Sequence, residues 1–122
     1  MKIIIKTKNL ELTSALEDFI YKKIGMIKKF INVLKREDEV GKTLAEVFVE
    51  VEKETKHHNK GQIFSCQVEI KLPGRSLLAK ANSDDLYKAI VEARKEIEAE
   101  IKKYKFKNID KNRREQRKYN NY

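Results

Sequence analysis

The stretch SDDLYKAIVEARKEIEAEIKKY, residues 83–104, is the clearest helix in the chain. Its apolar residues recur at three- and four-residue steps, which is the period of one face of an α-helix. They form one stripe about six turns long, made of Leu86, Ile90, Ala93, Ile97, Ile101 and Tyr104. We expect Ser83 to cap the N-terminus, where Asp84 and Asp85 suit the helix dipole. A stripe of this length needs a partner surface, which the rest of the chain should supply.

A second helix is predicted over residues 14–31. Its apolar residues also follow the helical period: Leu16, Phe19, Ile20, Ile24, Ile27, Phe30 and Ile31. Thr13-Ser14 offers a cap, and Ser14 with Glu17 has the spacing of a capping box. Gly25 lies opposite the stripe and weakens the helix locally by about 1 kcal/mol relative to alanine.

Four short segments have the composition of β-strands. Residues 44–52 and 62–72 alternate apolar and polar side chains, as half-solvated strands do, while residues 2–7 and 75–81 are shorter. The connections at 35–43, 53–61 and Pro73-Gly74 are charged or contain turn residues.

The resulting order is β-α-β-β-β-α, which predicts an α+β fold of two layers. Strands 2 to 4 should form an antiparallel meander, and the first strand should pair parallel with the second through a right-handed crossover. Packing both helices on one face of this four-stranded mixed sheet satisfies both helical stripes. We expect the folded domain to span residues 1–107, followed by a basic tail at 108–122 that is disordered or folds only on a partner.

The charge of the chain points to a polyanionic partner. The net charge is +9, and residues 105–122 alone carry seven Lys or Arg and two acids, a net charge of +5. This balance favours nucleic acid or an anionic membrane surface. The other interpretation is a soluble domain with a basic tail.

Targeting and membrane signals are not recognisable. No window approaches 18 apolar residues, and the N-terminal run of three isoleucines is too short for a signal peptide. One cysteine, Cys66, rules out an internal disulfide and suits a reducing compartment. We therefore expect a cytoplasmic protein.

The usual catalytic and metal-binding motifs are missing. His57 and His58 are adjacent, a poor spacing for one metal ion, and no CxxC or HxxxH pattern supplies further ligands. Cys66 falls on the apolar side of a strand, where it would act as a small hydrophobe. No glycine-rich phosphate loop is present. The sequence predicts no enzyme, no cofactor, no metal and no small-molecule substrate.

Lysines recur on the predicted helices. Lys88, Lys95 and Lys102 follow a seven-residue spacing and form one line, beside a second line of Glu92, Glu96 and Glu100; Lys22 and Lys29 fall together on the first helix. A solvated surface with i,i+4 ion pairs is one interpretation. The other is that two neighbouring helices present their lysines to phosphates.

A family resemblance favours the second interpretation. The run AKANSDDLYKAI, residues 79–90, resembles the signature that enters the last helix of ribosome hibernation-promoting factors, also called ribosome-associated inhibitors or sigma-54 modulation proteins. NLELTSALEDFIYKKIGMIKKF resembles the first loop and helix of the family, and VEIKLPG its third strand and turn. The resemblance covers residues 1–105, and the chain ends too early for the extra C-terminal domain of long members. It resembles the short form.

The resemblance implies a non-enzymatic protein that binds small-subunit rRNA in the mRNA and tRNA channel and inactivates idle ribosomes in stationary or stressed cells. It further implies a monomer off the ribosome and no membrane partner. The lysines expected to contact rRNA are Lys22, Lys23, Lys29, Lys80, Lys88, Lys95, Lys102, Lys103 and Lys105. Three residues depart from the family pattern: Met26 stands where lysine is common, and Glu96 and Ala99 replace a lysine and an arginine.

Two other functions fit the sequence. One is a general double-stranded-RNA-binding module, although the strand before the first helix and the acids at Asp84 and Asp85 argue against it. The other is a protein-interaction domain that acts on a transcription factor.

Overall fold

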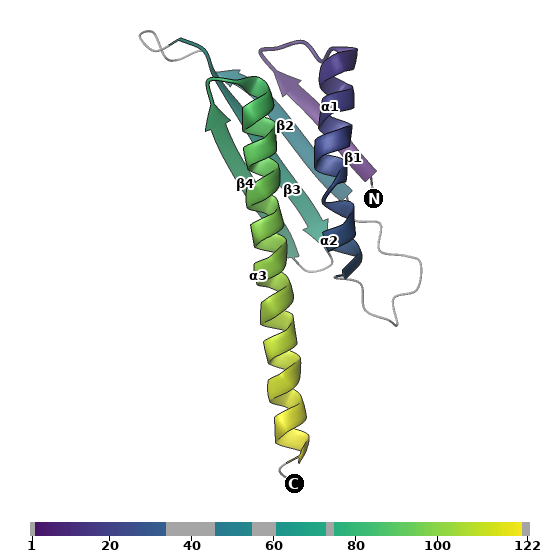
Figure 1. Cartoon of the computed structure of the whole chain (residues 1–122). Helices are drawn as coiled ribbons and strands as arrows, with labels where there is room; N and C mark the ends of the chain where they lie inside the picture. The colour runs from purple at the N-terminus through teal and green to yellow at the C-terminus, as the bar shows by residue number, and fades with distance from the viewer. Residues whose placement is uncertain (1, 34–45, 55–60, 73–74, 121–122) are drawn as a thin grey trace.

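The computed structural model describes residues 2–33, 46–54, 61–72 and 75–120. Its elements are β1 (Lys2–Lys8), α1 (Ser14–Gly25), α2 (Lys28–Val33), β2 (Glu46–Glu54), β3 (Ile63–Leu72), β4 (Arg75–Ser83) and α3 (Leu86–Asn120). All helices lie on one side of the sheet (Figure 1). The predicted two-layer α+β fold is therefore confirmed, with the first helix in two pieces.

The sheet has its strands in chain order, β1-β2-β3-β4. β1 pairs parallel with β2, and the remaining neighbours pair antiparallel, as predicted. The register places Ile4 beside Phe48, Phe48 beside Glu69, and Glu69 beside Leu78. Residues of equivalent position on the four strands thus form rows across each face of the sheet.

The core lies between the sheet and the helices. Alternate residues of the two central strands are buried there: Val47, Val49, Val51, Cys66, Val68 and Ile70. From the helix side, Ile20, Ile24, Ile90, Ile97 and Ile101 are buried against them. Burial of one such isoleucine stabilises the fold by about 1.5–3 kcal/mol, so the two apolar stripes fix how the helices sit on the sheet.

The first helix breaks where a single helix over residues 14–31 was predicted. At Gly25 the helix ends, and the amides of Met26 and Ile27 donate to carbonyls three residues back, at 3.3 and 3.1 Å. These tighter bonds form a turn before α2 begins at Lys28. Glycine has low helix propensity, and Ile24 and Ile27 are both buried, so the apolar stripe continues through the break.

One predicted helix cap is confirmed and one is shifted. Thr13 of the predicted Thr13-Ser14 pair caps α1, and its hydroxyl accepts from the Leu16 amide at 3.2 Å. Asp85, rather than Ser83, caps α3, with Oδ1 accepting from the Tyr87 amide at 2.9 Å. Ser83 is the last residue of β4, and pairing with Phe64 keeps it in the strand. Its hydroxyl accepts from the Asp85 amide at 3.2 Å and so stabilises the turn between strand and helix.

The last helix is longer than predicted. The loss of apolar periodicity placed its end near Tyr104, yet α3 continues to Asn120 and extends beyond the sheet (Figure 1). The extension contains no glycine or proline and is rich in lysine, arginine and other good helix formers. Propensity therefore favours the helix beyond the apolar stripe, and the division into a domain at 1–107 and a tail at 108–122 stays a prediction. No helix in the described ranges is long and apolar enough to cross a membrane.

Candidate nucleic-acid interface

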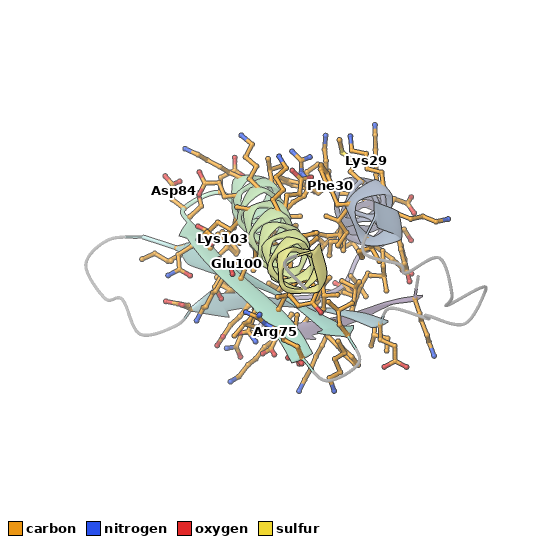
Figure 2. The ribbon with its side chains drawn as sticks, turned by 90° about the horizontal axis from the view of Figure 1, so that it is seen from below. Lys29, Phe30, Arg75, Asp84, Glu100 and Lys103 are labelled. Carbon is orange, nitrogen blue, oxygen red and sulfur yellow. The ribbon has the colours of Figure 1, made fainter. Side chains whose placement is uncertain are left out.

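Two lines of lysines follow the outer side of the helix layer. Lys22 and Lys29 lie opposite the buried stripe of α1 and α2, while Lys88, Lys95 and Lys102 lie opposite the stripe of α3. All five side chains are exposed. α1 and α3 contact each other and start at the same end of the sheet (Figure 1), and Figure 2 shows Lys29 pointing away from the sheet. The two lines therefore run side by side, as the sequence predicted.

The five lysines have no acidic partner within the described part of the chain. The predicted line of Glu92, Glu96 and Glu100 lies on the flank of α3 that faces away from α1. Lys103 belongs to this flank, where its Nζ lies 3.4 Å from Glu100 (Figure 2). The outward side of the layer is thus mainly cationic, although Asp18 lies one turn before Lys22 on α1 and Glu98 lies between the helices.

A seam of aromatic and basic side chains separates the two lines. At its start, Phe19 of α1 and Tyr87 of α3 form an edge-to-face pair, with ring centroids 4.6 Å apart and planes at 90°. Lys23 Nζ lies 5.8 Å from the Phe19 ring centroid, within the range of a cation–π contact. The stem of Lys23 is half-buried while its ammonium stays beside the aromatic pair.

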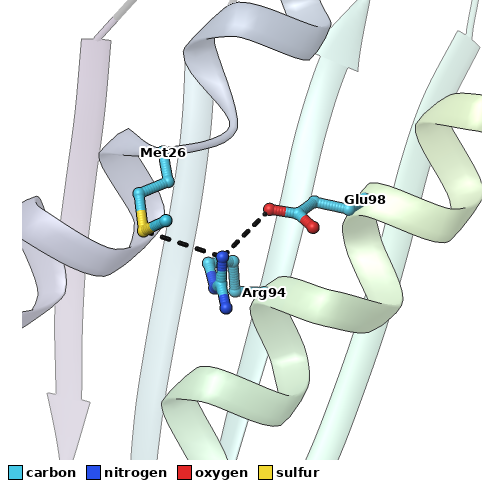
Figure 3. Close-up of polar contacts among 3 residues, drawn as sticks. All are labelled: Met26, Arg94 and Glu98. Atoms are coloured by element: carbon cyan, nitrogen blue, oxygen red, sulfur yellow. Dashed lines mark hydrogen bonds and ion pairs between the residues drawn. The ribbon is translucent and has the colours of Figure 1, made fainter.

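Arg94 occupies the middle of the seam. Its Nη1 donates to Glu98 Oε1 at 3.2 Å and to Met26 Sδ at 3.6 Å (Figure 3). The arginine side chain is only 15% exposed, and its Nε is buried with no hydrogen-bond partner. Glu98 therefore offsets the charge of the Arg94 guanidinium between the helices.

Phe30 lies farther along the seam, between α2 and α3 (Figure 2). The ammonium groups of Lys29 and Lys102 lie 5.2 and 5.3 Å from its ring centroid. One aromatic ring thus contacts a lysine from each line.

The remaining expected contact residues are placed differently. Lys80 lies on β4 between Ala79 and Ala81, which are buried against the helices, so its side chain belongs to the opposite face of the sheet. Lys105 continues α3, and its side chain lies outside the described part. The helix layer therefore brings together Lys22, Lys23, Lys29, Lys88, Lys95 and Lys102. The role of each of the nine lysines stays a prediction.

The sequence profile described as Sigma 54 modulation protein / S30EA ribosomal protein matches residues 3–109. The chain belongs to this family. Membership confirms the resemblance drawn from residues 79–90 and places the chain among ribosome-associated proteins of the hibernation-factor type. No curated protein sequence matches it.

Two solved structures share the fold of this S30EA family member. The Protein Y N-terminal domain from Thermus thermophilus has a TM-score of 0.60 and 23% identity, over 85% of this chain and 99% of that one. A ribosomal subunit interface protein from Coxiella burnetii has a TM-score of 0.62 and 24% identity, over 86% of this chain and 98% of that one.

In this S30EA family member, sequence reasoning missed the seam. Phe19 and Phe30 were assigned to the core stripe, and Arg94 and Tyr87 were not assigned a role. Their signal is positional, because each lies at the edge of an apolar arc rather than at its centre. Which two edges face each other can be predicted only when the relative direction of the helices is known.

Cys66 has no chemical role at this interface. It is fully buried, and burial raises the pKa of its thiol to about 12, so the prediction of a small buried hydrophobe is confirmed. His57 and His58 lie outside the described residues. Among the described residues, no three His, Cys, Asp or Glu side chains group as metal ligands would.

Proposed function

We propose that this protein binds the small ribosomal subunit through the outer side of its helix layer and inactivates idle ribosomes by occupying the mRNA and tRNA channel. The observation that carries the proposal is the pair of unpaired lysine lines in a chain of a ribosome-associated family. Binding alone blocks the channel, so no reaction and no cofactor are involved. The protein acts in the cytoplasm and is a monomer off the ribosome.

The chemistry of the two lines fits phosphate recognition. Neighbouring helix axes lie about 8–10 Å apart, so lysines on both lines reach the same groups of backbone phosphates. Such contacts read the shape of a folded RNA rather than its sequence. With six cations engaged and a slope of 0.7–0.9 per phosphate, affinity should fall roughly 300- to 2,000-fold between 50 and 200 mM salt.

Co-sedimentation with purified small subunits tests the proposal. We expect the protein to pellet with the subunit at low salt, to leave it as salt rises, and to reduce translation in vitro at stoichiometric amounts. A protein that stays in the supernatant at 50 mM salt and leaves translation unchanged would refute the proposal.

Competition with RNA duplex of arbitrary sequence separates this function from a general double-stranded-RNA-binding module. A subunit-specific protein should resist a hundredfold excess of duplex at moderate salt. Displacement by an equimolar amount would favour the general module instead.

A further inference from the structure

We propose that Tyr87 is a stacking platform for an unpaired nucleotide, placed at the start of the seam between α1 and α3. The inference deepens the proposed function, because it names single-stranded RNA as the ligand class of this part of the surface. It starts from Tyr87, a residue of α3 that is 44% exposed.

The edge-to-face geometry leaves at least one face of the Tyr87 ring uncovered by Phe19. In an edge-to-face pair, one ring presents its edge to one face of the other. Phe19 therefore covers at most one face of Tyr87, whichever of the two presents its edge. Phe19 packs against the core, so it holds the tyrosine ring in place before any ligand arrives.

Two other aromatic rings of the helix layer differ from Tyr87. Phe30 has the ammonium groups of Lys29 and Lys102 near its ring, and Tyr104 has the Arg75 guanidinium 5.2 Å from its centroid. No cation lies over Tyr87 within the described part of the chain. A nucleobase has a π-face that stacks on such a ring whatever its identity.

The surrounding charge favours a nucleotide over an apolar ligand. Lys23 lies beside Phe19, and Lys88 follows Tyr87 on the outer line. Asp84 points to the side of α3 away from α1 (Figure 2), and an Asp85 carboxylate oxygen accepts from the α3 backbone. Lys23 and Lys88 are therefore the cationic side chains nearest in the helix layer to the phosphate of a stacked nucleotide.

Tyr21 provides a matched control. It is 45% exposed, almost the same as Tyr87, and it also lies in the helix layer. It is two residues from Phe19 and Lys23, so it falls on the flank of α1 that faces away from α3. Both lysine lines remain intact when either tyrosine is changed.

The first experiment measures affinity for purified small subunits. Tyr87→Leu keeps apolar volume and removes the π-face, and we expect it to weaken binding about 5- to 150-fold, the range of one lost base stack. Tyr87→Phe should bind like wild type, and so should Tyr21→Leu. Thermal melts of all three variants show whether the helix pairing is intact.

The second experiment reads stacking directly and needs no ribosome. The chain contains no tryptophan, so Tyr87→Trp and Tyr21→Trp each carry a single indole. Titration with single-stranded poly(U) at low salt should quench the indole at 87 and leave that at 21 unchanged, while a duplex of equal length should quench neither.

Absence of quenching at position 87 overturns the inference, even if Tyr87→Leu binds weakly, since the tyrosine would then act through packing. That result leaves the proposed function intact as long as wild type binds subunits in a salt-dependent way. Failure of wild type to bind subunits at all refutes the proposed function and leaves the poly(U) titration to decide the stacking site.

Discussion

The outer side of the helix layer and the open face of the sheet both carry lysines, but the two sets of lysines differ in their acidic neighbours. On the sheet, Lys2, Lys6 and Lys8 of β1 lie directly beside Glu46, Glu50 and Glu52 of β2. In the last of these pairs, Lys8 Nζ lies 3.8 Å from Glu52 Oε1. On the helices, the lysine lines have no such partners within the described residues. The position of the acids, rather than the number of lysines, thus distinguishes the two faces.

The open sheet face also differs in its apolar content. Ile4 and Phe48 lie side by side there, and Lys71 Nζ lies 4.6 Å from the Phe48 ring centroid. These residues, with Glu50 and Glu69, line a depression in the sheet. Carboxylates and ammonium groups both line it, so attraction and repulsion of a phosphate would largely cancel. We therefore expect this face to remain outside the RNA contact.

Charge reversal should produce the largest difference in subunit affinity between the two faces. Lys22→Glu with Lys95→Glu should weaken subunit binding at least a hundredfold, since each ammonium–phosphate contact contributes about 1.5 kcal/mol or more. The salt slope should fall by about two. Lys6→Glu with Lys80→Glu makes the same charge change on the sheet and should alter affinity less than threefold. Equal losses from the two double variants would show that only net charge matters.

A change in the core between the faces should affect stability and leave the interface unchanged. Cys66→Ser places a hydroxyl where the thiol is fully buried, and the unpaired polar group should lower the free energy of unfolding by about 1–3 kcal/mol. Chemical denaturation measures this loss. Subunit affinity, measured well below the melting temperature, should match wild type; a parallel drop would mean that the core shapes the interface.

The free energy of unfolding at alkaline pH should depend on the ionisation of the same thiol. Burial raises the pKa of this thiol from 9.0 to about 12 in the folded protein. Between these two pH values the thiol is therefore protonated in the folded state and largely ionised in the unfolded state. Stability therefore falls as pH rises through this window, by up to about 1.4 kcal/mol per pH unit from this group. Cys66→Ala lacks this contribution, so its stability should decline less steeply above pH 9. Parallel curves for the two proteins would contradict the assignment.

Glu98 is the acid within the seam. Its removal should strengthen subunit binding, whereas charge reversal on the lysine lines should weaken it. Glu98→Gln leaves the Arg94 guanidinium uncompensated, which should cost about 1 kcal/mol of stability, since both side chains retain some exposure. The added positive charge should tighten subunit binding about three- to tenfold. Glu50→Gln on the sheet is the control and should not change affinity. Weaker binding by Glu98→Gln would mean that the ion pair orders the interface.

The smallest effect should come from the ion pair at the end of β1. Lys8 and Glu52 are separated by 3.8 Å and Lys8 is largely exposed, so Lys8→Ala should change the free energy of unfolding by less than about 1 kcal/mol. Subunit affinity should stay within a factor of two. A larger loss of affinity would place β1 within the contact.

Periodicity was sufficient to predict most of the fold. The alternation in residues 44–52 and 62–72 gave the faces of two strands, and the stripe from Leu86 to Tyr104 gave the packing face of α3. The cap of α3 was missed because several nearby residues could serve equally well, and Gly25 was expected to weaken the first helix rather than to end it. The end of α3 was predicted too early because apolar spacing indicates only the part of a helix that packs against a surface. It does not reveal a helical segment that helix propensity alone favours.

Some features of the candidate site could likewise be predicted from the sequence, and others could not. The lysine lines follow from seven-residue spacing on a single helix, so they were predictable. The contacts of Tyr87 with Phe19 and of Arg94 with Met26 join residues 68 apart in sequence, and they depend on two helices lying parallel. The face to which Lys80 belongs follows from strand alternation, since Ala79 and Ala81 are both buried.

Lysine acetylation of the protein bound to small subunits, read by mass spectrometry, tests most directly which face meets the RNA. The account predicts that Lys22, Lys95 and Lys102 are protected several-fold relative to the unbound protein. It predicts that Lys6 and Lys80 react at unchanged rates. Protection of Lys6 and Lys80 with unchanged reactivity along the helix lines would contradict it.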